Sequence, residues 1–491
     1  MKKFKIIVVI LICCGSCTTT TFAETQTNNE PNEPAYLKLI PPDKLKEDLD
    51  FLFKTIEEVH PDMYAYTSKE EFEPMRDELY RQIKHPMTRL EFYKFTAPIV
   101  ASLKNAHTFL APFFREYKKY LESGGKVFPL ELRLDDLKVV LAKNYSPTSL
   151  PLGGEIITIN ERAASEIFKS FSHWFAAESK NTNPQLIANA TVLRALLLLE
   201  FGSVESWHLK IKANNTEVSS YTVKSVSAAE FKGQGGTTAF ELKNSYQYFH
   251  EYNAVLLRIN SFGGDVGKLK KFLNESFQKI HKEKVSNIII DVRENTGGSD
   301  THVHPLVEYL TGKPYRLYEK TEIKISPQSR ERIEHIRRQL PDKFTNKKDG
   351  DIVTLELPFR ALSAKPFRFT GQIFVLSGPR SFSASTIFAS TIKCSGIGTL
   401  VGVETPDPTT LYADIVYSEL PNSELRIAVA SKCMIAACGK PDGRGVIPDY
   451  EVKQKLEDTA KGIDTVLQFT LDLIKQGSKS KISTKLKGSE K

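Results

Sequence analysis

A serine that could act as a nucleophile lies at position 383, where an apolar run gives way to a helical pattern. Residues 375–389 read VLSGPRSFSASTIFA, so a Gly378-Pro379 turn separates a buried strand from a helix that starts near Ser383. Free backbone N–H groups and the dipole at a helix N-terminus stabilise a developing oxyanion, which suits acyl transfer. A serine that only caps the helix would give the same pattern. The motif alone leaves both interpretations open.

A second motif follows another apolar run. Residues 291–298 read DVRENTGG and come directly after the apolar residues 288–290. The adjacent glycines Gly297 and Gly298 allow the backbone to approach a ligand closely and to turn N–H groups into a cleft. An ordinary flexible turn is the alternative.

Taken together, the two motifs resemble family S41 of serine peptidases, the tail-specific (C-terminal-processing) and tricorn-like proteases. Residues 291–298 are followed, in the order typical of that family, by residues 383–385, and residues 445–449, GVIPD, match the element that closes the family's core. The resemblance covers most of the chain. It implies an α/β fold, with a crotonase/ClpP-like α/β core, an N-terminal helical domain and a small β-rich PDZ-like domain.

The resemblance assigns Ser383 as the nucleophile and gives the oxyanion hole to the backbone N–H groups of Ala384 and of Gly297 or Gly298. A serine hydroxyl also needs a base that takes its proton. Tail-specific members use a lysine in the segment that here reads VETPDP, residues 403–408, and this segment contains no lysine. A Ser-Lys dyad is therefore not expected.

Tricorn-like members place a histidine just after the helical region, where this chain has His107. Imidazole titrates near neutrality and can both take and return a proton. The resemblance is therefore closer to the histidine-using, tricorn-like branch, with His107 as the base. Those members orient the histidine through a glutamate before the closing element, and Asp442 occupies the equivalent place in this chain. Asp442-Gly443 is also a common turn dipeptide.

We expect an exported serine peptidase that hydrolyses polypeptides and needs no metal or organic cofactor. Two other functions stay open. The missing lysine, and Thr386 where many active members carry glutamate, would also fit a catalytically inactive S41-like protein that binds peptides or other ligands. The same fold could also hydrolyse a non-protein ester or amide, because a fold does not fix a substrate.

The N-terminal part of the chain is predicted to be helical. Apolar residues recur at helical spacing within residues 37–115, and two capping boxes, Ser68 with Glu71 and Thr88 with Glu91, mark helix starts. This N-terminal helical domain ends just after the candidate base.

The rest of the chain divides into two further domains. Residues 120–225 alternate apolar and polar positions and are expected to form the PDZ-like β-rich domain. Residues 240–472 are expected to form the α/β catalytic core, because strands that are apolar on both faces are typical of a sheet covered by helices on both sides. Residues 319–360 are expected to be an excursion from this core. The predicted core strands lie at residues 255–259, 288–290, 373–376, 400–403 and 425–429.

The N-terminus predicts export. A basic start precedes an apolar run, residues 6–14, that is too short to span a membrane comfortably. Residues 1–23 are therefore interpreted as a signal peptide and residues 24–36 as a linker. Gly15-Ser16-Cys17 also resembles a lipobox, whose cysteine would be lipidated and would tether the protein to a membrane. We expect a periplasmic or cell-envelope protein, and lipidation of Cys17 would make it an outer-membrane lipoprotein.

The charge distribution limits the expected partners. The formal net charge is +8 over 491 residues, but part of it lies in the leader and in a Lys-bearing tail, residues 473–491, that is expected to be disordered. The sequence has no basic face interleaved with aromatic residues, so nucleic-acid binding is not expected. The expected partner is a polypeptide substrate, and the oligomeric state is left open.

The folded part holds Cys394, Cys433 and Cys438, which leaves open a Cys433–Cys438 bridge or small buried thiols.

Overall fold

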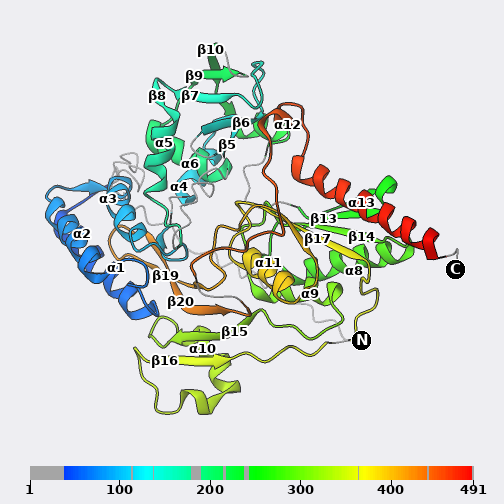
Figure 1. Ribbon diagram of the computed structural model, residues 1–491. Coiled ribbons are helices and arrows are strands. Elements are labelled where there is room, and N and C mark those ends of the chain that lie inside the picture. The colour runs from blue at the N-terminus through cyan, green and yellow to red at the C-terminus, as the bar shows by residue number, and fades with distance from the viewer. Residues whose placement is uncertain are drawn as a thin grey trace, which may run out of the picture.

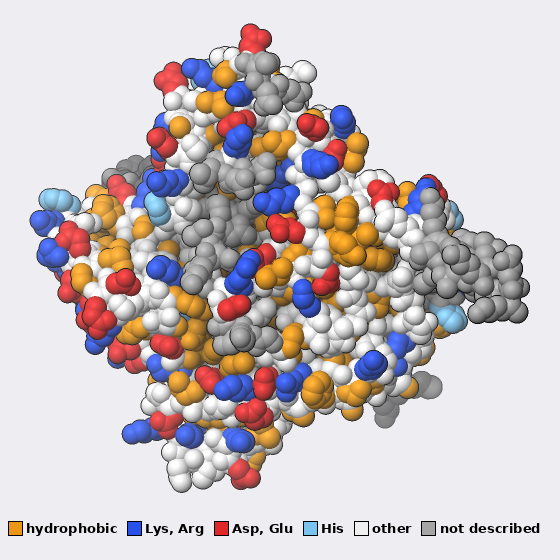
Figure 2. All heavy atoms as spheres, viewed as in Figure 1, with side chains coloured by type: hydrophobic (Ala, Val, Ile, Leu, Met, Phe, Trp, Pro, Cys, Tyr) orange, Lys and Arg blue, Asp and Glu red, His pale blue; other side chains and the backbone are white. Residues whose placement is uncertain are grey.

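The structure is a computed structural model that describes residues 38–111, 114–135, 138–178, 190–213, 217–236, 243–362, 364–438 and 442–488. The predicted signal peptide and linker lie outside these residues. Figure 1 shows the N-terminal helices on one side, a β-rich unit above, and the α/β core with the C-terminal helix on the other side. On the face shown in Figure 2, positive and negative side chains are interspersed. Within the described ranges, no helix has both the length and the apolar character that crossing a membrane requires.

Helices α1 to α4 make up the N-terminal helical part of the chain, and a separate N-terminal domain stays a prediction. Ser68 and Thr88 begin α2 and α3 with complete capping boxes, in which the side chain accepts a backbone N–H and a glutamate three residues later returns the bond. Both predicted helix starts are thus confirmed. The elements are α1 (Pro42–Val59), α2 (Lys69–Gln82), α3 (Arg89–Ala101) and α4 (Phe114–Glu122), with the short strands β1 (Leu39–Ile40), β2 (Met87–Thr88) and β3 (Phe109–Leu110).

The β-rich unit is built on an antiparallel sheet of order β10-β9-β7-β6-β5, against which α5 and α6 pack. Inward side chains such as Leu132, Ile156 and Leu209 enter a core that is shared with the N-terminal helices. The likeness of this unit to PDZ domains stays a prediction. Its elements are β4 (Lys126–Val127), β5 (Leu130–Asp135), β6 (Lys138–Asn144), β7 (Glu155–Ile159), β8 (Arg162–Ala163), α5 (Ala164–Ser172), α6 (Ala190–Phe201), β9 (Ser206–Ala213), β10 (Glu217–Lys224), β11 (Val226–Ser227) and α7 (Ala228–Gly233).

The core sheet has the order β12-β13-β14-β17-β18-β21, and its strands are parallel except for β12 at the edge. This arrangement confirms the predicted α/β core. Its elements are β12 (Ser245–Phe249), η2 (His250–Tyr252), β13 (Ala254–Arg258), α8 (Val266–Lys282), β14 (Asn287–Asp291), α9 (Asp300–Leu310), β17 (Gln372–Ser377), α11 (Ala384–Cys394), β18 (Thr399–Gly402), β21 (Tyr450–Glu451), α12 (Leu456–Ala460) and α13 (Thr465–Gly488).

Helices cover both faces of the core sheet, which explains its doubly apolar strands. Ile288 and Ile290 of β14 face the layer formed by α8, α9 and α11, whereas Ile289 between them faces α13 on the opposite side. The parallel pairing of β14 with β17 brings the carboxyl ends of these two strands together. Both sequence motifs begin at this edge of the sheet.

A second, antiparallel sheet of order β16-β15-β20-β19 joins the N-terminal domain to the core, because β3 of that domain pairs with β20. Residues 425–429 were predicted as a core strand, but they lie mostly in β20 of this second sheet. A short buried apolar run fits a strand in either kind of sheet, so the pattern could not decide between them. Its elements are β15 (Tyr318–Lys324), α10 (Arg330–Gln339), η3 (Pro341–Phe344), β16 (Ile352–Glu356), β19 (Leu411–Glu419) and β20 (Arg426–Ala436).

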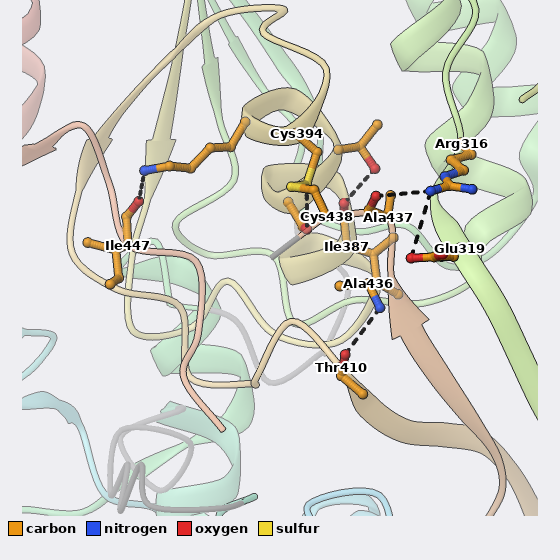
Figure 3. Close-up of a disulfide and its surroundings, with 12 residues drawn as sticks. Arg316, Glu319, Ile387, Cys394, Thr410, Ala436, Ala437, Cys438 and Ile447 are labelled. Atoms are coloured by element: carbon orange, nitrogen blue, oxygen red, sulfur yellow. Dashed lines mark hydrogen bonds and ion pairs between the residues drawn. A yellow bond between two sulfur atoms is a disulfide. The ribbon is translucent and has the colours of Figure 1, made fainter. Parts of the chain in front are cut away.

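A disulfide joins Cys394 to Cys438, with Cα atoms 5.6 Å apart (Figure 3). It links the last residue of α11 to the segment that follows β20, and Cys433 remains a buried free thiol. The Cys433–Cys438 bridge left open by the sequence is therefore not formed, because Cys438 faces α11 across a separation of 44 residues. The tail expected to be disordered from residue 473 continues α13 as far as Gly488.

Candidate active site

The turn between β17 and α11 holds Ser383 in a strained conformation. Ser383 is the N-cap of α11, yet its side chain makes no capping hydrogen bond. Its φ of 56° lies in the left-handed region that residues other than glycine rarely adopt. The backbone around it is fixed, since Ser383 N donates to Asp407 Oδ2 at 2.7 Å and Phe382 N donates to Asn295 O at 3.1 Å. The structure thus leaves the Ser383 hydroxyl free of the capping role.

His107 lies opposite this hydroxyl. Its Nε2 is 3.0 Å from Ser383 Oγ, across 276 positions of sequence. The imidazole is buried and stacks on the Phe382 ring with centroids 4.9 Å apart. Thr108 Oγ1 accepts a hydrogen bond from Ala430 N, and the pairing of β3 with β20 starts one residue later. The second sheet therefore places the end of the N-terminal helical part beside Ser383.

A glutamate lies behind the imidazole. Glu178 Oε2 is 3.6 Å from His107 Nδ1, and both atoms are buried without a hydrogen-bond partner among the described residues. The other oxygen, Oε1, accepts from Tyr412 N at 2.8 Å and from the Tyr66 hydroxyl at 3.2 Å. Two separate parts of the chain thus hold this carboxyl group. Glu178 was not among the residues predicted from the sequence, because it follows α5 without any local motif.

Asp442 does not occupy the place predicted for it. Its side chain is exposed, and Oδ1 accepts a hydrogen bond from Arg444 N at 3.0 Å. This is the side-chain turn that Asp-Gly sequences commonly form. The carboxyl group nearest to His107 Nδ1 comes from Glu178 instead, so the prediction that Asp442 orients the histidine is corrected here.

A second carboxyl group, Asp407, completes a buried cluster with His107 and Glu178. One side-chain nitrogen or oxygen of each residue lies within 4.8 Å of the others. Burial raises the pKa of Glu178 to about 8 and that of Asp407 to about 7, because desolvation disfavours the charged carboxylate. Burial also lowers the pKa of His107, against a smaller opposing effect of Asp407. The neutral imidazole that burial favours leaves a ring nitrogen of His107 able to accept a proton.

The two glycines of the second motif lie in close contact with neighbouring backbone, and Gly297 lies against Ser383. A Cβ on Gly297 would come within 2.7 Å of Ser383 Cβ, and one on Gly298 would come within 2.1 Å of Phe262 O. Gly297 N already donates to Asn295 Oδ1 at 2.9 Å. Within the described part of the chain, the amides of Gly298 and Ala384 have no such partner. Of the predicted oxyanion donors, these two amides are therefore the ones left available.

A strand-to-helix serine, an imidazole within hydrogen-bond distance and a buried carboxyl group behind it form the arrangement of a serine hydrolase. Residues 253–452 match the model of peptidase family S41, and this range contains Ser383 and the glycine motif. The protein is therefore a serine-type peptidase, and residues 253–452 are the part that is similar to family S41.

Solved structures of similar fold include mature CPAF complexed with lactacystin, with a TM-score of 0.64, 14% identity and coverage of 90% of this chain and 99% of that one. Mature CPAF gives a TM-score of 0.60 at 13% identity, covering 88% and 96%. The photosystem II D1 C-terminal processing protease gives 0.45 at 13% identity, covering 86% and 98%. No curated protein sequence matches the chain. At these identities the CPAF structures show a shared fold alone.

Proposed function

We propose that this peptidase uses Ser383 as nucleophile and His107 as general base, on the histidine-using side of the S41 family. The observation that carries the proposal is the 3.0 Å separation of His107 Nε2 and Ser383 Oγ. A proton can be transferred directly over this distance. Among the described residues, His107 is also the hydrogen-bond partner of that hydroxyl, which favours an imidazole over a lysine as the base.

The geometry supports a two-step acyl transfer. Ser383 Oγ attacks the peptide carbonyl carbon while its proton moves to His107 Nε2, and the amides of Ala384 and Gly298 stabilise the oxyanion of the tetrahedral intermediate. The imidazolium then protonates the leaving amine, and an acyl ester remains on Ser383. A water molecule next gives its proton to His107 and attacks this ester, which releases the acid and restores the serine.

Glu178 is proposed to hold His107 in the productive tautomer. When Glu178 is ionised, the proton on Nδ1 faces its Oε2 and the lone pair of Nε2 faces Ser383. The 3.6 Å separation is longer than a hydrogen bond, and such contacts often shorten only in the substrate complex. Since the imidazolium is positive, its formation favours the ionised form of Glu178 beside it.

The proposed substrate is a polypeptide, as the S41 match at residues 253–452 favours. We expect a fluorophosphonate probe to label the protein once, at Ser383, and the protein to hydrolyse an unstructured polypeptide. Labelling is read by mass spectrometry of the tryptic peptides. A protein that takes no label would be a binding relative, and a labelled protein that cleaves small esters but no polypeptide would be a hydrolase of another substrate class.

We also propose that the protein is exported to the periplasm or cell envelope. The leader pattern of residues 1–23 supports export, and so does the Cys394–Cys438 bridge, since disulfides persist in oxidising compartments. Fractionation of cells under thiol-trapping conditions should recover the protein in the envelope, with Cys433 as the alkylated thiol of the folded part. Membrane association that disappears in Cys17→Ala would assign the lipid tether. A reduced, cytoplasmic pool would contradict export.

A further inference from the structure

The side chain of Asp407 is fully buried directly beneath the nucleophile, and the mechanism above makes no use of it. Its Oδ2 accepts the Ser383 amide at 2.7 Å, whereas Oδ1 has no hydrogen-bond partner in the described structure. Thr405 Oγ1 donates to the Asp407 carbonyl and accepts from Val446 N, which fixes the segment that carries this aspartate.

Burial of a carboxyl group in a dry interior costs free energy, and here the group accepts only one backbone N–H. Burial of a carboxylate that has an unsatisfied oxygen destabilises the fold unless other contacts offset it. The raised pKa of Asp407, caused first by burial, reflects that cost. A neutral acceptor would satisfy the Ser383 amide equally well. The position therefore calls for an explanation other than stability.

The hydrogen bond acts on the strained residue itself. Ser383 has φ 56° and ψ −121°, a conformation that persists only where the surroundings impose it. The bond to Asp407 turns the Ser383 amide toward the protein interior, so that Oγ faces His107 and the next amide, of Ala384, is available to an oxyanion. Loss of this bond would allow the turn to relax toward an ordinary helix cap.

We propose that Asp407 is a positioning residue that holds the backbone of Ser383 in its reactive conformation and, when ionised, adds a negative charge beside His107. The charged and titratable groups that face it are His107 and Glu178, and the Ser383 amide is its hydrogen-bond donor. The charge favours the imidazolium that forms when the serine proton is transferred. This inference rests on the proposed function of Ser383 and His107.

Two variants separate the hydrogen bond from the charge. In Asp407→Ala both are lost, so the rate of fluorophosphonate labelling and kcat should fall about 100-fold while KM changes little, as expected for a misplaced reacting group. In Asp407→Asn the amide oxygen still accepts Ser383 N–H, so the labelling rate should recover much of that loss. Because the charge is absent, the acid limb of its kcat profile should move to lower pH. Crystal structures should show Ser383 outside the left-handed region in Asp407→Ala and inside it in Asp407→Asn.

Asp48 provides a matched control for the loss of a buried carboxyl group. It is fully buried and accepts Asn422 N and Ser423 N, both at 2.8 Å, in contacts that join α1 to the loop before β20. Asp48→Ala should lose thermal stability and still be labelled at the wild-type rate per folded molecule. Equal slowing in Asp48→Ala and Asp407→Ala would overturn the positioning role.

The remaining outcomes are also decisive. Wild-type labelling and an unchanged Ser383 φ in folded Asp407→Ala would contradict the proposal. If Asp407→Ala does not fold, an unshifted acid limb in Asp407→Asn would contradict the role of the charge. Wild-type labelling in Asp407→Asn with Ser383 outside the left-handed region would contradict the positioning role. A wild-type protein that takes no label would refute the proposed function instead, and the Ser383 φ in the variants would still decide whether Asp407 positions the turn.

Discussion

Ser383→Ala is expected to abolish probe labelling and to lower kcat by a factor of about 10⁴ or more, as removal of a catalytic serine does in other serine hydrolases. The substitution removes only the hydroxyl group, and within the described structure the hydrogen-bond partner of this group is His107 Nε2. Since one hydrogen bond contributes little net stability, the free energy of unfolding should change by about 1 kcal/mol or less. Steady-state kinetics and thermal denaturation of one preparation measure both quantities.

Ser385→Ala is the matched control for this substitution. Ser385 lies two residues away in α11, is fully buried, and its Oγ has no hydrogen-bond partner among the described residues. The control therefore removes a hydroxyl from the same helix without removing a catalytic contact, and its kcat should stay near that of the wild type. Retained hydrolysis in Ser383→Ala, or an equal loss in Ser385→Ala, would remove Ser383 from the role of nucleophile.

The parts of the site that depend on local sequence could be predicted. A strand, a Gly-Pro turn and a helix N-terminus are consecutive in the chain, so the position of Ser383 follows from residues 375–389 alone. The same holds for Gly297 and Gly298 at the end of β14. His107 has no local signal, and only the resemblance to S41 peptidases pointed to it.

The parts that depend on tertiary contacts could not be predicted. Glu178 reaches the site because Tyr412 N and the Tyr66 hydroxyl hold it there, and neither contact can be inferred from the residues around it. The Cys394–Cys438 bridge likewise depends on the end of α11 lying near the segment after β20. For the segment that contains Asp407, the sequence indicated only that the lysine of tail-specific members is missing. The burial of Asp407 could not be predicted, because a buried acidic side chain has no distinctive spacing.

The choice between Glu178 and Asp442 is testable through the histidine tautomer. In Glu178→Gln the amide nitrogen can donate to His107 Nδ1, which then carries a lone pair and leaves the proton on Nε2. A protonated Nε2 cannot accept the serine proton, so kcat should fall by a factor of about 10³ to 10⁴. Asp442→Asn, in which the side-chain oxygen can still accept Arg444 N, should change kcat by less than about twofold, because surface substitutions away from the site have small effects. Loss of activity in Asp442→Asn with full activity in Glu178→Gln would restore the prediction from sequence and reject the role of Glu178.

The pH dependence of the free energy of unfolding gives a second, independent test of the protonation of Glu178. Its pKa in the folded protein is raised to about 8, above the value of about 4.5 for an exposed glutamate, so the folded state binds the proton more tightly than the unfolded state. The contribution of this group to the free energy of unfolding is therefore favourable in acid and is lost as the pH rises through this interval. Glu178→Gln cannot titrate, whereas Asp407 titrates in both proteins. The free energy of unfolding of the variant should thus rise relative to wild type between pH 5 and 8, and a difference that does not change with pH would show that Glu178 is ionised throughout and lies in a more solvated environment than the one described.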